Sequence, residues 1–270
     1  MKPNRIDAAF HRARAERRAA LMPFLTAGDP DLATTAAIIE AIAQRGADVL
    51  ELGIPYSDPI ADGPTIQASF VRAMNKGVSV RDIFAMVRDV RTRCDLPILT
   101  MISVSIVSRI GPEAYCTQAA EAGIDGVIIP DLPVDEAAGI ARIAETKGLH
   151  PVFLIAPTTP DARMNQIAHR SKGFIYYVSV VGVTGARTEL PADLVDHLRR
   201  LRELTKKPVA VGFGIATPEQ VRTVAAHADG AIVGSAIVRK VHENAGQPRE
   251  KIASAVGDFV AQLASGTRPV

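Results

Sequence analysis

The sequence predicts an α/β fold, a single (βα)8 TIM barrel over residues 1–270, and three observations support this prediction. Short apolar runs alternate with longer amphipathic stretches almost to the C-terminus, which is typical of repeated strand–helix units. The segments at residues 46–52, 123–129 and 228–234 resemble one another, and each passes from the end of a helix into a nearly continuous apolar run. Such runs are typical of strands that are buried in a parallel sheet. Eight such units over this length suit one barrel.

Each predicted strand is an apolar run bounded by turn-forming residues. The strands are predicted at residues 22–26, 49–52, 98–101, 126–129, 152–155, 174–178, 209–211 and 231–233. Helical periodicity fills the intervals at residues 32–44, 66–74, 80–91, 112–121, 134–146, 162–169, 194–204 and 218–227. An extra N-terminal helix is predicted at residues 6–20, a short extra helix after the eighth strand at 237–243, and a last helix at 251–263. A doubly wound open sheet is the alternative, but it usually has fewer strands and an early Gly-x-Gly-x-x-Gly turn.

Composition and charge predict an ordinary cytoplasmic protein. The chain is 47% hydrophobic with a formal net charge of +2, and an aromatic content of 4% is low for the stacking platforms that bind nucleic acid. The dense basic cluster at residues 12–18 is interpreted as the solvated face of the first helix, with a nucleic-acid patch as the alternative. Cys94 and Cys116 have no metal or redox spacing, which fits a reducing compartment, and no apolar run reaches membrane-spanning length.

The segment at residues 51–62 carries the strongest chemical signal. Glu51 interrupts an apolar strand, and a buried glutamate must be paired, protonated or functional. Glycines and prolines then prevent regular structure, so Asp58 and Asp62 are predicted on a long, stiffened loop. Glu51 and Asp62 are therefore the leading hypothesis for an acid/base pair. Binding of Mg²⁺ through Glu51, Asp58 and Asp62 is the alternative.

Glycines after the seventh and eighth strands predict a phosphate site. Phe213 and Gly214 follow one strand, while Gly234 and Ser235 follow the next and open a short helix. Barrels commonly bind phosphate between these two loops, where glycines let backbone N–H groups approach the anion and the helix adds the positive end of its dipole. The alternative is that these glycines only turn the chain.

Three long connections, at residues 53–64, 102–110 and 179–191, follow strands and are therefore predicted at the C-terminal face of the barrel. Thr184 in the last of them could hydrogen-bond a carboxylate of the first if the loop closes over a ligand. An ordinary flexible loop is the alternative.

Several chemistries find no support in the sequence. None of the lysines lies at the C-terminal end of a predicted strand, where a Schiff base would form. The histidines have no metal-ligand spacing, and no Gly-x-Ser-x-Gly motif occurs. What remains is acid/base chemistry by carboxylates on a small phosphate ester, without a metal or a cofactor.

The chain resembles the α-subunit family of tryptophan synthase from about residue 5 to residue 263. The resemblance is carried by the motifs at residues 24–30, 51–67, 130–133, 182–186, 212–215 and 234–238. It implies cleavage of indole-3-glycerol phosphate to indole and glyceraldehyde 3-phosphate, in L-tryptophan biosynthesis. By this resemblance Glu51 is the principal acid/base and Asp62 binds the indole N–H. We expect Leu50, Leu52 and Ile54 to bury Glu51 and raise its pKa, and Asp62 to stay ionised on a wetter loop.

The resemblance also assigns the other site residues. It places phosphate on Gly185, Gly214, Gly234 and Ser235 with Phe213 alongside, and indole among Phe24, Ile66 and Tyr176, while Thr184 meets Asp62. It implies no cofactor in this chain and an α2β2 heterotetramer with a β subunit that holds pyridoxal phosphate. Asp58 and Pro59 are expected to face that partner.

One segment departs from the family pattern. After the third strand the family usually carries Met-Tyr-x-Asn, whereas this chain has Ile-Ser-Val-Ser at residues 102–105. This departure affects the expected tuning of the pocket and of the signal to the partner. Drift with compensation elsewhere is one explanation, and altered function is another. The departure motivates one alternative function, a ligand-binding allosteric activator of the β subunit with weak cleavage activity. A second alternative is another phosphate-sugar isomerase on the same fold, which would share the anion site.

Overall fold

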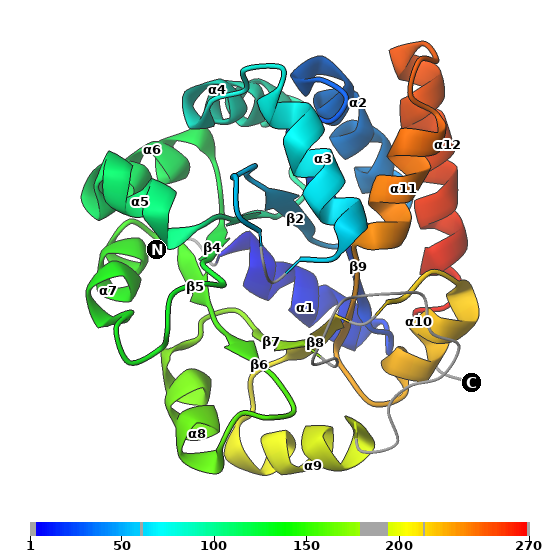
Figure 1. The fold of residues 1–270 in the computed structure, drawn as a ribbon. Coiled ribbons are helices and arrows are strands. Elements are labelled where there is room, and N and C mark those ends of the chain that lie inside the picture. Colours follow the sequence, from blue (N-terminus) through cyan, green and yellow to red (C-terminus); the bar gives the residue numbers. More distant parts are fainter. Residues whose placement is uncertain (1–3, 60–61, 179–193, 213, 269–270) are drawn as a thin grey trace.

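The computed structural model describes residues 4–59, 62–178, 194–212 and 214–268. Its strands form one parallel sheet in the order β5-β4-β3-β2-β1-β9-β8-β7-β6. The two ends of this order, β5 (His150–Val152) and β6 (Leu154–Ile155), are separated in the chain by Phe153 alone. They are therefore two parts of one barrel strand, and the sheet curls back to form a nearly closed barrel ringed by helices (Figure 1). The predicted fold class is confirmed.

Every predicted strand is present, with bounds that shift by a few residues. The remaining strands are β1 (Ala20–Thr26), β2 (Leu50–Gly53), β3 (Ile98–Met101), β4 (Gly126–Ile128), β7 (Ile175–Val178), β8 (Val209–Gly212) and β9 (Gly230–Val233). The helices are α1 (Arg5–Ala15), α2 (Leu32–Ala43), α3 (Pro64–Met74), α4 (Val80–Val90), α5 (Val104–Ile110), α6 (Pro112–Ala122), α7 (Ala138–Thr146), α8 (Asp161–Arg170), α9 (Leu194–Leu204), α10 (Pro218–Ala225), α11 (Ser235–Glu243) and α12 (Arg249–Ala264). No helix of the described residues is long and apolar enough to cross a membrane.

Two of the predicted segments differ from the structure. The first helix ends at Ala15, well before residue 20, because Arg17 adopts a positive φ of 54° and turns the chain toward β1. Residues 102–110, predicted as a long connection with no helix of its own among the predicted helices, contain α5. Ser103 is the N-cap of α5, and its hydroxyl accepts a hydrogen bond from the Ser105 amide at 3.2 Å. Side-chain oxygens at this position satisfy amides that have no partner inside the helix.

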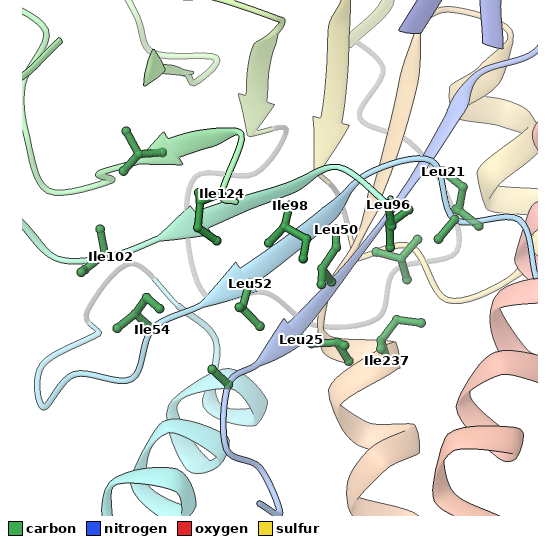
Figure 2. Packing of buried hydrophobic residues seen from close by; sticks show 14 of the residues in the cluster. Leu21, Leu25, Leu50, Leu52, Ile54, Leu96, Ile98, Ile102, Ile124 and Ile237 are labelled. Carbon is green, nitrogen blue, oxygen red and sulfur yellow. The ribbon is translucent and has the colours of Figure 1, made fainter. Parts of the chain in front are cut away.

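The core has two layers, inside the barrel and between the barrel and its helices. Side chains along a strand alternate between these layers. In β2, Leu50 and Leu52 face the helices, on the same side as Leu25 of β1 and Ile237 of α11 (Figure 2). Glu51 lies between the two leucines in the sequence and therefore faces the interior.

The similar strand beginnings in the sequence have a common structural role at the N-terminal end of the barrel. Asp48, Asp125 and Asp229 each come just before a strand, and each carboxylate accepts a backbone N–H from the neighbouring strand. The three amides and their distances are Leu21 at 2.9 Å, Ile98 at 2.9 Å and Val209 at 2.8 Å. Each aspartate also pairs with an arginine: Arg18, Arg91 and Arg202 respectively. These repeats therefore fasten adjacent strands to each other.

Helix α1 covers the N-terminal end of the barrel, where it lies across the centre of the view in Figure 1. Ile6, Ala9, Phe10 and Ala13 form its buried face. The Phe10 ring packs on Phe174 with ring centroids 5.4 Å apart, and both rings belong to the interior core.

We expect Asp125→Ala to lower the free energy of unfolding by about 3 kcal/mol, because it leaves the nearly buried Arg91 without its carboxylate. The matched variant is Asp135→Ala, whose ion pair with Arg163 is exposed and should contribute less than about 1 kcal/mol. Urea unfolding of both variants measures the difference. Equal losses would contradict the role given to the buried aspartates.

Candidate active site

Glu51 lies inside the barrel with its carboxyl group buried. Its in-register neighbours are Phe24 of β1 and Leu99 of β3, which both belong to the interior core. Glu51 is 1% exposed, and neither carboxylate oxygen has a hydrogen-bond partner among the described residues. A buried carboxylate without partners loses its hydration without compensation, so this environment favours the protonated form.

Burial, followed by the charge of Asp62, raises the pKa of Glu51 from 4.5 to about 8. The sequence predicts this direction but assigns the burial to Leu50, Leu52 and Ile54, which is wrong. These three side chains lie in the outer core layer, on the opposite face of the strand (Figure 2). The apolar cover comes from the interior residues of the neighbouring strands, because alternation along β2 separates Glu51 from its neighbours in sequence.

Asp62 lies at the end of the loop that follows β2, just before α3. Its amide donates to the Pro59 carbonyl at 3.0 Å, and its own carbonyl accepts the side-chain amide of Gln67 at 2.8 Å. Gln67 also donates to the Pro59 carbonyl at 3.2 Å. Gln67, near the start of α3, therefore ties two backbone carbonyls of this loop to the helix.

Asp62 is less exposed to solvent than the sequence predicts. It is half-buried, and burial raises its pKa from 3.8 to about 6, although a hydrogen bond from Tyr56 acts in the opposite direction. The predicted ionised state at neutral pH is consistent with this value. The pKa values of the two carboxyl groups thus differ by about two units, as an acid/base pair with divided roles requires.

Tyr56 is a site residue that the sequence reasoning missed. Its hydroxyl donates to Oδ2 of Asp62 at 3.5 Å, and its ring packs on Phe70 with centroids 5.2 Å apart. Phe70 of α3 therefore holds the Tyr56 ring in place, so that its hydroxyl can donate to the Asp62 carboxylate. An aromatic residue between two prolines of a stiffened loop is the signal that could have indicated it.

Apolar and aromatic side chains of the interior core surround Glu51. Phe24 and Ile66 are 4% and 6% exposed, and Tyr176 packs against the same interior cluster. The Phe24 ring lies so close to Gly53 that a Cβ atom there would be 2.4 Å from it, and the Tyr176 ring approaches Gly212 in the same way at 2.8 Å. Burial, followed by the charges of Glu51 and Asp62, raises the pKa of Tyr176. The structure therefore brings the predicted pocket residues together with both carboxylates.

Part of the predicted phosphate site is described. Gly234 is the N-cap of α11, and among the described residues a Cβ at this glycine would have only Phe24 nearby, at 3.9 Å. Gly234 and Ser235 thus bring a helix N-terminus next to Phe24, and Gly214 follows β8, the strand adjacent to β9. Helix N-termini attract anions through free N–H groups and the helix dipole. Thr184, Gly185 and Phe213 lie outside the described residues.

The segment that departs from the family pattern is tied to the next loop. The Ser103 hydroxyl donates to Oδ2 of Asp131 at 2.6 Å, and the Val104 amide donates to Oδ1 at 2.8 Å. Asp131 therefore holds the start of α5.

The other two residues of the loop after β2 differ from each other. Asp58 is exposed and accepts a hydrogen bond from Ser57 at 2.7 Å, while Pro59 is buried. Within the described part of the chain, no three His, Cys, Asp or Glu side chains are grouped to hold a metal ion. Glu51, Asp58 and Asp62 therefore do not form the Mg²⁺ site that was the alternative.

Comparison with known proteins assigns the family. A family model described as tryptophan synthase alpha chain matches residues 10–267. The chain belongs to the tryptophan synthase alpha chain family. Relatives of that name include one from Geobacter sulfurreducens, 48% identical over 87% of this chain and 89% of its own length, and one from Rhodopirellula baltica, 45% identical over 96% of each chain.

Solved structures of the family have the same fold. The alpha subunit of tryptophan synthase from Legionella pneumophila superposes with a TM-score of 0.90 at 36% identity, over 98% of both chains. A chain of tryptophan synthase from Mycobacterium tuberculosis superposes with a TM-score of 0.91 at 34% identity, over the full length of both. The resemblance that the sequence motifs carry is thereby confirmed.

We expect Tyr56→Phe to raise the pKa of Asp62, because the variant removes the hydroxyl that stabilises the carboxylate. Titration of the aspartate carboxyl carbons by 13C NMR measures the shift. Tyr115→Phe is the matched control, since the Tyr115 hydroxyl bonds Thr100 at 2.7 Å and not a carboxylate. An unchanged or lower pKa of Asp62 in Tyr56→Phe would remove Tyr56 from this role.

Glu51→Gln should stabilise the protein, increasingly as pH rises. The folded state holds the Glu51 proton up to about pH 8, whereas the unfolded chain releases it near 4.5, so ionisation opposes folding above that lower value. Glutamine has no such ionisation. Urea unfolding should show little gain for the variant at pH 4.5 and a gain of about 4 kcal/mol at pH 8. A gain that does not grow with pH would mean that Glu51 is not buried as described.

Proposed function

We propose that Glu51 and Asp62 carry out the reaction of this family, the cleavage of indole-3-glycerol phosphate to indole and glyceraldehyde 3-phosphate. Family membership makes the chain a lyase of tryptophan biosynthesis. The proposal adds the residues and their protonation states. The observation that carries it is the buried Glu51 carboxyl group, which has no hydrogen-bond partner among the described residues.

Glu51 serves first as the acid and then as the base. With a pKa near 8 it is protonated at neutral pH, and it gives this proton to the indole carbon that bears the side chain. The resulting carboxylate removes the proton of the adjacent side-chain hydroxyl. The bond between the ring and the side chain breaks, its electrons return to the indole ring, and the side chain leaves as an aldehyde. Glu51 ends the cycle protonated, so no other proton carrier is needed.

Asp62 stabilises the charge that develops on the ring. Protonation of the ring carbon places a positive charge at the indole nitrogen, and a carboxylate that accepts the N–H hydrogen bond favours this state. With a pKa near 6, Asp62 is mostly ionised at neutral pH. Tyr56 supports this ionised form through its hydroxyl.

The remaining predicted residues bind the two ends of the substrate. Phe24, Ile66 and Tyr176 hold the indole ring in the apolar pocket. The phosphate group lies on Gly185, Gly214, Gly234 and Ser235, with Phe213 alongside, and Thr184 meets Asp62 when the loops close. The position of Gly234 beside Phe24 supports this division, because it puts an anion site within reach of the ring pocket.

The partner in this proposal is the tryptophan synthase β subunit, which holds pyridoxal phosphate and forms an α2β2 heterotetramer with this chain in the cytoplasm. No cofactor is assigned to the chain itself. Asp58, which is exposed, and Pro59 lie in the loop that faces the partner. Asp131 fixes the first residues of α5, and this supports an ordered surface next to that loop.

The direct test is indole release from indole-3-glycerol phosphate by the chain, with and without the β subunit. Glu51→Gln should lower the rate roughly 10³-fold while substrate binding persists, because only proton transfer is lost. Asp58→Asn is the matched control and should leave the rate of the isolated chain unchanged. Background cleavage by the wild type, together with a ligand-dependent rise in β-subunit activity, would instead support the allosteric activator.

The cleavage rate should depend on pH as a bell-shaped curve. Activity needs Asp62 ionised and Glu51 protonated, so kcat/KM should fall below about pH 6 and above about pH 8. Asp62→Asn should lower the rate and remove the acidic limb. A rate that keeps rising above pH 8 would contradict the acid role of Glu51.

A further inference from the structure

A basic recess lies at the N-terminal end of the barrel, opposite the carboxylates. It has a volume of about 370 Å³ and lies between α1 and the turns that precede β7, β8 and β9. Arg14, Arg17, Arg18 and Lys206 line it, and Phe10 and Pro208 are among its apolar lining residues. The basic cluster of the sequence therefore borders a concave site, although it was interpreted as a solvated helix face.

The acidic residues of the basic recess are already paired. Asp7 lies 2.8 Å from the ring of His150. Asp229 pairs with Arg202 and also accepts the Val209 amide at 2.8 Å. Asp7 is therefore held toward His150 and Asp229 toward Arg202, and among the described residues neither forms an ion pair with Arg14, Arg17 or Lys206.

Three cations in the recess have no such partner. Arg18 is held by Asp48 at 2.6 Å. For Arg14, Arg17 and Lys206, the described residues provide no ion pair or side-chain hydrogen bond, and all three are exposed. Clustered cations around a concave surface concentrate anions, and guanidinium groups match phosphate in shape.

Arg17 occupies a position where glycine would be more favourable. The Arg17 amide donates to the Arg14 carbonyl at 3.0 Å and the Arg18 amide to the Ala13 carbonyl at 3.1 Å, which is the Schellman pattern. The residue at the centre of this pattern is usually glycine, because its φ is positive, and here φ is 54°. Arginine at this position adds a cation to the recess, although its backbone conformation is less favourable than that of glycine.

We propose that the basic recess binds a small phosphate-bearing anion, at a site separate from the catalytic one. A volume of about 370 Å³ is in the range of small-molecule sites rather than of a nucleic-acid groove. Phe10 is only 5% exposed and offers no platform on which a base could stack. The apolar floor would cover the organic part of the ligand, and Arg14, Arg17 and Lys206 would bind its phosphate.

In the test, inorganic pyrophosphate is titrated into the full chain and its binding is monitored by backbone amide NMR. The amides of Arg17, Gly173 and Lys206 should shift with a common, saturable dissociation constant. Amides at Gly234 and Ser235 report separately on the catalytic phosphate site. Failure of one site is therefore distinguishable from failure of the other.

Arg17→Gly combined with Arg14→Gln should weaken the recess binding by roughly tenfold or more, because two charge-assisted contacts are lost. The melting temperature should be no lower than that of the wild type, since glycine suits the turn. Arg88→Gln, at an exposed position of α4, is the matched control and should bind like the wild type. The proposal would be overturned if the wild type showed no saturable shift, or if the double variant bound pyrophosphate with equal affinity. It would also be overturned if the recess bound duplex DNA but not pyrophosphate.

Discussion

The burial of one carboxyl group inside a parallel barrel is the constraint on which the rest of the structure depends. Side chains of β2 alternate, so Leu50 and Leu52 pack under the helices while Glu51 occupies an inward position. The residues next to it in register, Phe24 and Leu99, are apolar and offer no hydrogen bond. The barrel thereby gives up stability at this position and gains a group that remains protonated near neutral pH.

The two ends of the barrel have different tasks. At the N-terminal end, buried or half-buried aspartates accept amides from neighbouring strands and pair with arginines, which fastens the sheet. At the C-terminal end, Glu51 and Asp62 have few or no partners among the described residues, and their pKa values are raised. This is the usual division between stability and chemistry in such barrels. The basic recess is an exception, because it places unpaired cations at the stabilising end.

The sequence predicts what local patterns determine and misses what depends on distant contacts. Strand positions, Glu51 and the glycine at the start of α11 follow from apolar runs and from breaks in them. Helix α5 does not, because its first residues are held by Asp131, 28 residues away in the chain from Ser103. The hydrogen bond from Tyr56 and the left-handed turn at Arg17 also need three-dimensional coordinates to be recognised.

The ionisation of Glu51 in the folded chain is the most direct measurement. Titration of the glutamate carboxyl carbons by 13C NMR, with the signal assigned by its loss in Glu51→Gln, reports this pKa without any assay of turnover. A folded, ligand-free protein in which Glu51 titrates near pH 8 is the predicted result. Titration near its ordinary value of 4.5 would show that the carboxyl group is hydrated, and would contradict both its buried environment and its role as the acid.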